Sequence, residues 1–479
     1  MKKFMNWKIV VLAMLSSTLF ILFFAVSISP IYPYDFGRDG GFFMQTGREM
    51  TRGSIPYVDF FDQKGPYMFF IQWIGQLIYN GKFGIFMIAC FSLAISLYFA
   101  YQSVFIVLKD HKYALFIWVP FLSFYSLTIE KGNYTGDYCL PMSFVSLYIG
   151  LTYLVNRSKC TQHPPRYAFV YGLFAGIIAL IRITNATLIL SIVLTVLVVL
   201  LVDKLYKNIL VSIVFFLLGL CIAFSIPILY GLLTGSLGEM FYQTFVFGYI
   251  YAVTGSSAVA NVKLYIILVF LLVLTALSVS KKNGYVLNTL IIAANSSLMI
   301  SYMIGFLYIH YHTNMIPNLV LMFCLIVKRF HRIPRRFIII ATSFIMILMF
   351  YRIYDTFEQG FVNRNKEAYD QMIDLKEHIP EDQQNSVYFY VKLQTSINYV
   401  LDIPYVNRYI AWQDKYSSMD PKITDEIVQM FDNNPPQYVV TAEVIGEEIL
   451  NPVVFLRVRT DYDMVYQNEH YNLYLLKPQ

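Results

Sequence analysis

Charged residues are scarce in this chain of 479 residues, where Asp, Glu, Lys and Arg together make up only 14%. A soluble globular chain carries roughly 25% charged residues, so the deficit argues against a soluble protein. Hydrophobic residues reach 57%. They form recurring apolar runs long enough for a membrane core that needs about 20 residues per helix. The composition therefore predicts an integral membrane protein.

Cysteine is also scarce. The five cysteines share no metal-type spacing, and none follows Cys324. These facts argue against a cysteine-ligated zinc site and against a disulfide framework in the last third of the chain. The net charge of +6 comes from basic residues scattered over short loops, without a patch that would bind nucleic acid.

The apolar runs predict about eleven transmembrane helices, followed by a soluble domain. The first run has an alternative reading as a signal peptide, because Ala25-Val26-Ser27 resembles a cleavage site. We favour a retained helix, since the run is long for a signal peptide. The predicted spans are 10–28, 83–108, 114–129, 138–156, 166–182, 184–203, 208–233, 263–280, 286–305, 312–327 and 336–352. The apolar stretch 67–79 is expected to lie in the interface or to re-enter the membrane.

The domains are thus predicted as 1–352, a transmembrane domain, and 353–479, a soluble α/β domain. The second has short strand patterns at 387–391, 438–441, 464–466 and 473–476, with a hairpin around Asn468-Glu469. Helical patterns fall at 365–378, 396–400 and 422–431. We expect this domain to cap the active site or to recognise an acceptor or partner.

Loop charges predict the orientation, because basic residues favour the cytoplasmic side. With a cytoplasmic N-terminus, the inner loops would be short and strongly basic, and the C-terminal domain would be extracytoplasmic. This pattern fits a multi-pass protein of a bacterial plasma membrane. The inner-loop basic residues are Lys2, Lys3, Lys8, Lys109, Lys112, Arg157, Lys159, Arg166, Lys204, Lys207, Lys281, Lys282, Lys328, Arg329, Arg332, Arg335 and Arg336.

Acidic residues of the membrane part gather on the opposite, outer side. Carboxylates near lipid are costly and usually functional, so these outer loops are the expected site of chemistry. The first outer loop, 29–82, holds most of them. The outer acids are Asp35, Asp39, Glu49, Asp59, Asp62, Glu130, Asp137 and Glu239.

Within the first outer loop, residues 41–50 predict a short amphipathic helix on the membrane surface, with Phe42, Phe43 and Thr46 toward lipid. Its polar residues Gln45, Arg48 and Glu49 would face away from the lipid. Asp39 would lie at the N-terminus of this helix, where the helix dipole favours a carboxylate. Taken alone, Asp39 has a second reading as a simple helix cap.

The order of residues in this loop follows a family pattern. Asp39, Phe43 and Arg48-Glu49-Met50 are followed by Pro56-Tyr57 and by Lys64-Gly65-Pro66 before an apolar helix. The pattern resembles the first extracytoplasmic loop of GT-C glycosyltransferases, in particular bacterial relatives of protein O-mannosyltransferases and lipid A aminoarabinose transferases. Gly40 stands where that pattern usually has an acid, so the use of a second carboxylate or a metal there stays open.

The resemblance implies a base and a phosphate site. Asp39 would accept the proton of the acceptor hydroxyl, and Lys64 would stabilise the leaving lipid phosphate. Lys64 has the alternative role of an interfacial anchor. Asp137 corresponds to a family acid ahead of the fourth span, with an N-cap as its alternative. A divalent cation, if one is used, would suit oxygen ligands from Asp39 and Asp137.

Further substrate-binding candidates are Arg38 and Tyr57 in the first outer loop, together with Arg182 and His310. Arg182 interrupts two apolar runs, which fits either a phosphate contact or a side chain snorkelling to the headgroups. His310 and His312 are two residues apart and do not share a helix face, so a rim or substrate contact is favoured over zinc.

These features favour an inverting glycosyltransferase. It would move a sugar from a polyprenyl-phosphate donor to a cell-envelope glycan, lipid or protein acceptor. The alternatives are a transporter or flippase of lipid-linked glycans, and a non-catalytic envelope assembly protein. A transporter would place charges inside the spans, whereas the acids here gather outside.

Overall fold

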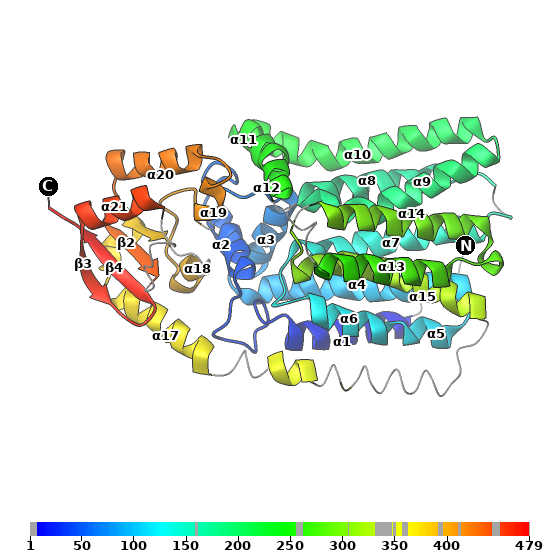
Figure 1. The fold of residues 1–479 in the computed structure, drawn as a ribbon, viewed down its shortest axis with the longest axis horizontal. Coiled ribbons are helices and arrows are strands. Elements are labelled where there is room, and N and C mark those ends of the chain that lie inside the picture. The colour runs from blue at the N-terminus through cyan, green and yellow to red at the C-terminus, as the bar shows by residue number, and fades with distance from the viewer. Residues whose placement is uncertain are drawn as a thin grey trace.

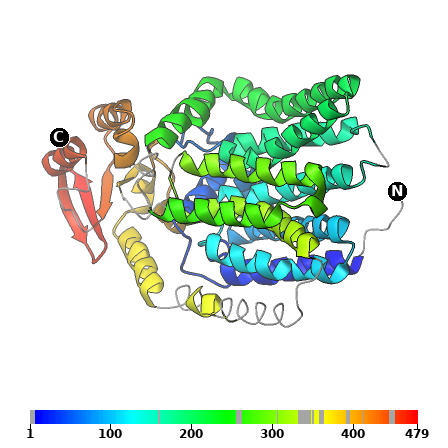
Figure 2. The ribbon, with the colours of Figure 1, turned by 45° about the vertical axis from the view of Figure 1, so that its right-hand side comes forward.

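The computed structural model describes residues 7–158, 161–254, 262–304, 306–330, 347, 351–356, 363–390, 396–410, 413–442 and 451–478. A bundle of long helices lies at one end of the molecule and a small mixed α/β region at the other (Figure 1). The N-terminus lies at the end of the bundle farthest from the C-terminal region, and the turned view shows the same arrangement (Figure 2).

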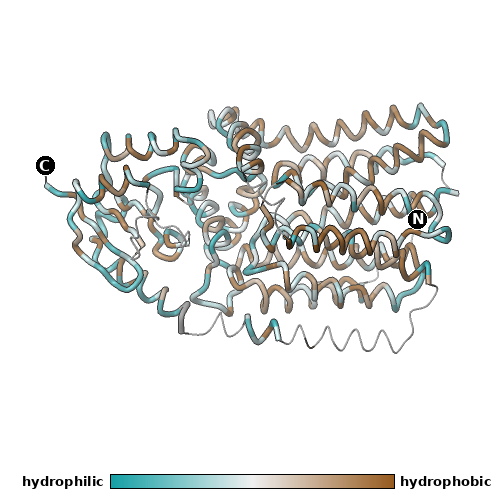
Figure 3. The backbone as a smooth tube through the Cα atoms, in the orientation of Figure 1, coloured by the Kyte–Doolittle hydropathy of each residue, from teal (hydrophilic) through white to brown (hydrophobic). Residues whose placement is uncertain are grey.

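The bundle consists of helices that are apolar on most of their surface, as Figure 3 shows by colour. A helix that is hydrophobic all round is stable when neighbouring helices or lipid surround it, since its backbone polar groups are satisfied internally. The helices are α1 (Trp7–Phe24), α4 (Lys82–Leu108), α5 (His111–Phe116), α6 (Trp118–Thr128), α7 (Thr135–Val155), α8 (Pro165–Arg182), α9 (Thr187–Val202), α10 (Tyr206–Thr234), α13 (Val262–Ser278), α14 (Gly284–Met303) and α15 (Ile316–Phe330).

Among the described residues, seven helical segments are long and apolar enough to cross a membrane. They confirm a polytopic helical membrane protein. Two of the predicted spans, 166–182 and 184–203, correspond to the single segment Pro165–Val202, which the short 3-10 helix η1 (Ile183–Ala186) interrupts. Helix α13 is shorter, and the predicted last span, 336–352, lies largely outside the described residues. The total of about eleven spans stays a prediction.

Two short helices of the first loop lie between the bundle and the C-terminal region (Figure 1): α2 (Asp39–Thr51) and α3 (Pro66–Ile78). Helix α3 has 13 residues. It is about 20 Å long at about 1.5 Å per residue, too short to cross a hydrocarbon core of about 30 Å. This length fits the expectation that the apolar stretch lies in the interface or re-enters the membrane, which stays a prediction.

Helix α2 forms where it was predicted, but its predicted environment is wrong. Phe42 and Phe43 do not face lipid, and Gln45 and Arg48 do not face solvent, because all four side chains are buried. The polar side of α2 is covered by the C-terminal region, whose backbone and carboxylates satisfy the side chains. The sequence pattern predicted the helix and its polar side. It could not predict that the C-terminal region packs on that side, because this contact joins residues far apart in the sequence.

The C-terminal region contains a four-stranded sheet in the order β1-β2-β4-β3, in which β1 and β2 are parallel and the other pairs antiparallel. The strands are β1 (Val387–Tyr390), β2 (Tyr438–Ala442), β3 (Tyr462–Gln467) and β4 (Tyr471–Leu476). The helices are α17 (Asn363–Glu377), α18 (Ile397–Leu401), α19 (Gln413–Ser417), α20 (Lys422–Asn433) and α21 (Pro452–Asp461). The predicted α/β class and the β3–β4 hairpin are confirmed, while α19 and α21 were not predicted.

The remaining short elements lie between the longer ones. They are α11 (Leu237–Phe241), the π-helix η2 (Tyr242–Phe247), α12 (Gly248–Thr254) and the 3-10 helices η4 (Lys281–Asn283), η5 (Ile309–Met315) and η6 (Glu381–Ser386). Helix η4 joins α13 to α14, and η6 joins α17 to β1. Aromatic packing joins the bundle to the C-terminal region at η2, where Phe61 and Phe247 meet Tyr416 of α19 at centroid distances of 5.6 and 5.3 Å.

Candidate functional site

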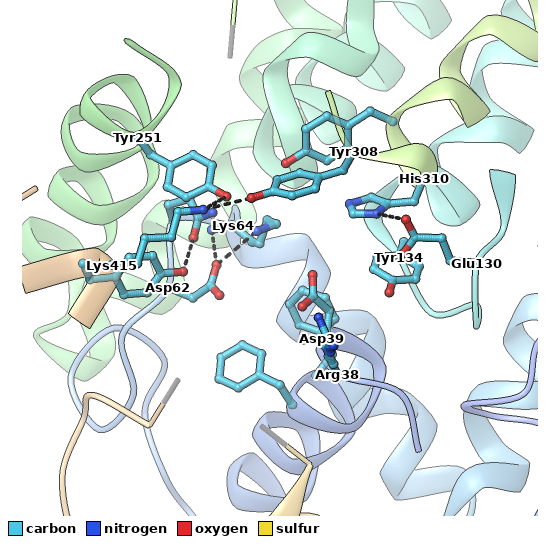
Figure 4. A pocket seen from close by; sticks show the side chains of 15 residues that line it. Arg38, Asp39, Asp62, Lys64, Glu130, Tyr134, Tyr251, Tyr308, His310 and Lys415 are labelled. Carbon is cyan, nitrogen blue, oxygen red and sulfur yellow. Dashed lines mark hydrogen bonds and ion pairs between the residues drawn. The ribbon is translucent and has the colours of Figure 1, made fainter. Parts of the chain in front are cut away.

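A cavity of about 200 Å³ lies where the first loop, the second loop (residues 129–134), the segment before α15 and α19 come together. Of the predicted site residues, it brings together Arg38, Asp39, Lys64 and His310 (Figure 4). The full lining is Arg38, Asp39, Phe42, Phe43, Asp62, Gln63, Lys64, Glu130, Tyr134, Tyr251, Tyr308, His310, Tyr311, Lys415 and Tyr416.

Asp39 is the first residue of α2, and its side chain points into the middle of this cavity (Figure 4). Among the described residues, no group donates a hydrogen bond to its carboxylate. Asp39 is therefore placed to accept a proton from a molecule bound in the cavity.

Gly40, which stands in place of a second acid, is closely packed. A Cβ at this position would lie 2.7 Å from Ser27 Cβ and 2.8 Å from Ser27 Oγ. Any side chain, a carboxylate included, would require the segment after α1 to move. The departure from the family pattern thus follows from close packing of α2 on that segment.

The loop that precedes α3 supplies a buried ion pair. Lys64 Nζ lies 3.7 Å from Asp62 Oδ1, and the same oxygen accepts a hydrogen bond of 2.7 Å from the Lys64 backbone N–H. Burial raises the pKa of Asp62, against the opposing effect of Lys64. Burial disfavours the Lys64 ammonium, but nearby groups, Asp62 foremost and Asp39 among them, outweigh burial and raise the pKa of Lys64. Lys64 therefore keeps its positive charge at neutral pH.

Glu130 and His310 form the opposite wall. His310 Nδ1 lies 3.3 Å from Glu130 Oε1, and the His310 ring stacks on Tyr134 with centroids 4.1 Å apart. Burial would raise the pKa of Glu130, but the contacts with His310 and Tyr134 outweigh burial and lower that pKa. Lys131, the next residue along the chain, pairs with Asp35 of the first loop.

Lys415 of α19 enters the cavity from the C-terminal region, and the sequence gave no signal for it. Its ammonium donates hydrogen bonds of 3.0 Å to the hydroxyls of both Tyr251 and Tyr308. It also lies 4.1 Å from the centroid of the Phe306 ring. Cations near aromatic faces are stabilised by the ring quadrupole, so this aromatic enclosure holds a further positive charge at the site, beside those of Arg38 and Lys64.

Three predicted site residues, Tyr57, Arg182 and Asp137, do not line the cavity. Tyr57 is buried below the loop and donates a 2.8 Å hydrogen bond to the carbonyl of Lys64, which positions that residue. Arg182 ends α8 and stacks on Tyr311, 3.1 Å from the ring centroid. It therefore contacts the wall of the cavity from behind.

The Asp137 carboxylate is held inside the bundle. It accepts hydrogen bonds from the Tyr125 hydroxyl at 2.8 Å and from the Tyr134 backbone N–H at 2.9 Å. The second bond makes Asp137 the third residue of α7 in a capping box, so the predicted N-cap position is wrong, although the carboxylate does cap the start of this helix. Its predicted catalytic role stays a prediction.

The two carboxylates considered for a metal ion are not brought together, since Asp39 lines the cavity and Asp137 does not. In the described part of the chain, no group of three or more His, Cys, Asp and Glu side chains is arranged to hold a metal ion. Use of a divalent cation stays an untested expectation.

No protein-family model matches the sequence, and no curated protein matches it significantly. Solved structures do match the fold. ArnT from Cupriavidus metallidurans bound to undecaprenyl phosphate is similar with a TM-score of 0.57 and 12% sequence identity, over 98% of this chain and 99% of that chain. ArnT in the apo state matches with a TM-score of 0.55 at the same identity and coverage. The chain therefore has the fold of ArnT, in agreement with the resemblance of its first loop to GT-C glycosyltransferases.

Proposed function

We propose that this chain is a GT-C glycosyltransferase that moves a sugar from a polyprenyl-phosphate donor to a cell-envelope acceptor. The observation that carries the proposal is the Asp39 carboxylate, which has no hydrogen-bond donor among the described residues and lies in one cavity with Lys64. The fold supports it further, because a structure of ArnT with that fold holds undecaprenyl phosphate.

The reaction is a single displacement. The acceptor hydroxyl oxygen attacks the anomeric carbon of the donor sugar as the bond between that carbon and the phosphate oxygen breaks. The hydroxyl proton passes to Asp39, and polyprenyl phosphate leaves with the bonding electrons. Attack from the face opposite the leaving group inverts the configuration at the anomeric carbon.

The leaving phosphate gains negative charge in the transition state, so fixed positive charge beside it lowers the barrier. Lys64 and Lys415 supply that charge from two different parts of the chain. Lys64 is held in place by Asp62 and by the Tyr57 hydroxyl under its carbonyl. Arg182, behind Tyr311, adds positive charge at longer range.

We place this chemistry on the outer face of the plasma membrane, with the N-terminus inside, because the basic loops favour that orientation. On that side nucleotide sugars are not available, which favours a lipid-linked donor. Membrane lipids surround the bundle, and the acceptor is an envelope glycan, lipid or protein.

The test is sugar transfer by the full chain in membranes supplied with a panel of labelled polyprenyl-phosphate sugars. Wild type is compared with Asp39→Asn and with the matched control Asp59→Asn, an exposed residue of the same loop whose carboxylate accepts a hydrogen bond from Ile55. We expect transfer by wild type and the control and its loss in Asp39→Asn. Movement of intact donor across the membrane without sugar transfer would favour a flippase. Neither activity with any donor would favour an assembly role.

A further inference from the structure

A second cavity, of about 540 Å³, adjoins the first one on the side of α17. The two cavities share three lining residues, Arg38, Glu130 and Tyr134. The second cavity is otherwise built from residues 34–37 of the first loop, from α17 and the α18 region, and from Lys131 and Arg352. Its volume is within the range of about 300–1,000 Å³ that is typical of small-molecule sites.

Aromatic rings from both parts of the chain form one wall of this second cavity. The ring of Tyr369, on α17, lies 5.4 Å from that of Tyr34 and 6.4 Å from that of Phe36, with the latter pair nearly parallel. All three rings are half-buried and line the cavity. An aromatic face matches the C–H face of a sugar ring, whose hydroxyls then point to polar groups around it.

The charged groups of the second cavity are largely neutralised within the protein. Asp35 pairs with Lys131 at 2.5 Å, and Arg352 pairs with Asp355 at 2.6 Å. Paired groups offer hydrogen bonds without excess charge, which favours a neutral polyol over a phosphate.

We propose that the second cavity binds the sugar units of the acceptor glycan that adjoin the reacting hydroxyl. The shared residues Arg38, Glu130 and Tyr134 form the passage through which that hydroxyl reaches Asp39. Tyr369 of α17 provides the stacking surface, so the C-terminal region selects the acceptor. This inference rests on the proposed function and adds the class of acceptor: a glycan whose sugar rings the protein recognises.

The test uses variants of α17, because no residue of this helix lines the first cavity, where the donor is proposed to bind. Ala368→Trp places a large ring in the second cavity, and Tyr369→Ala removes the stacking surface. Lys366→Trp adds the same ring at an exposed position of the same helix and is the matched control. Two readouts are compared for the full chain. The first is transfer of labelled sugar to the envelope fraction of the cells that produce this protein. The second is affinity for undecaprenyl phosphate in nanodiscs.

We expect transfer to fall by about tenfold or more in Ala368→Trp and Tyr369→Ala, the loss typical of a removed aromatic anchor. Affinity for undecaprenyl phosphate should stay within about twofold of wild type, which also shows that the variants fold. Lys366→Trp should match wild type in both. A delipidated glycan fraction from the same envelope should compete with transfer.

Three results would overturn the inference while leaving the proposed function in place: unchanged transfer in both cavity variants, loss of undecaprenyl phosphate binding together with transfer, or no competition by delipidated glycan. The last result would mean that the acceptor is recognised through a lipid. Wild type that neither transfers sugar nor binds undecaprenyl phosphate would instead contradict the proposed function itself.

Discussion

Arg48 joins the first loop to the C-terminal region, and its removal should loosen that contact strongly. Its side chain is only 11% exposed and donates hydrogen bonds of 2.9 Å to the Tyr399 carbonyl and 3.0 Å to Asp402. Its guanidinium also lies 3.9 Å above the Tyr399 ring. Arg48 is therefore a buried link between α2 and α18.

The size of the effect follows from these contacts. A hydrogen bond from a buried charged group contributes about 1.5–3 kcal/mol, and the cation–π contact about 0.5–2 kcal/mol. The ion pair with Asp402, whose side chain is 55% exposed, adds less than about 1 kcal/mol because solvent screens it. Arg48→Ala should therefore weaken docking of the C-terminal region by about 3–5 kcal/mol, which is at least about a hundredfold in the docking equilibrium.

The assay is limited proteolysis of the full chain in nanodiscs, where cleavage follows the population of the opened form when closing is fast. Arg52→Ala is the matched control, because Arg52 pairs with Glu49 and Asp402 but is more exposed. We expect cleavage of the C-terminal region to accelerate by about a hundredfold in Arg48→Ala and by less than about fivefold in Arg52→Ala. Equal rates in the two variants would refute the reasoning.

Three further outcomes follow from the same contacts. Lys415→Ala should weaken binding of undecaprenyl phosphate by about tenfold and Lys415→Arg should restore most of it; equal titration curves for wild type and Lys415→Ala would contradict a phosphate role. Gly41→Val should lower the thermal midpoint by several degrees, because a Cβ there would lie 2.2 Å from Ser396 Cβ; an unchanged midpoint would count against close packing of α2 on the C-terminal region. Asp62 and its neighbours raise the pKa of Lys64, so Lys64 is protonated below that pKa and loses its charge only as pH rises through it. Undecaprenyl phosphate affinity should therefore stay flat between about pH 7 and about pH 9, and a tenfold fall over that range would contradict this assignment.

The sequence predicted the helical bundle and the C-terminal α/β class because both follow from local patterns. Apolar runs of sufficient length form helices in lipid whatever their neighbours are. Asp39 at the start of α2 was likewise predictable, since the helix pattern begins directly after it.

The rest of the site depends on contacts between distant residues. The polar side of α2 has the pattern of a solvent-facing surface, yet Gln45 donates hydrogen bonds to Glu49 and to the carbonyl of Ile403 in the C-terminal region. Lys415 is separated from Tyr251 by 164 positions, so no local spacing in the sequence predicts their contact. Asp137 shows the opposite problem, because an acid at the third position of a helix has the same pattern whether it caps or catalyses.

The most direct test of the account compares binding and transfer in Asp39→Asn. Asp39 is assigned the proton of the acceptor hydroxyl and no contact that holds the donor, so the two properties should separate. We expect Asp39→Asn to bind undecaprenyl phosphate at least as tightly as wild type while its sugar transfer falls by about a hundredfold or more, the usual contribution of a general base. Transfer at the wild-type rate would contradict the role of Asp39, and loss of binding together with transfer would contradict the separation of base and phosphate site.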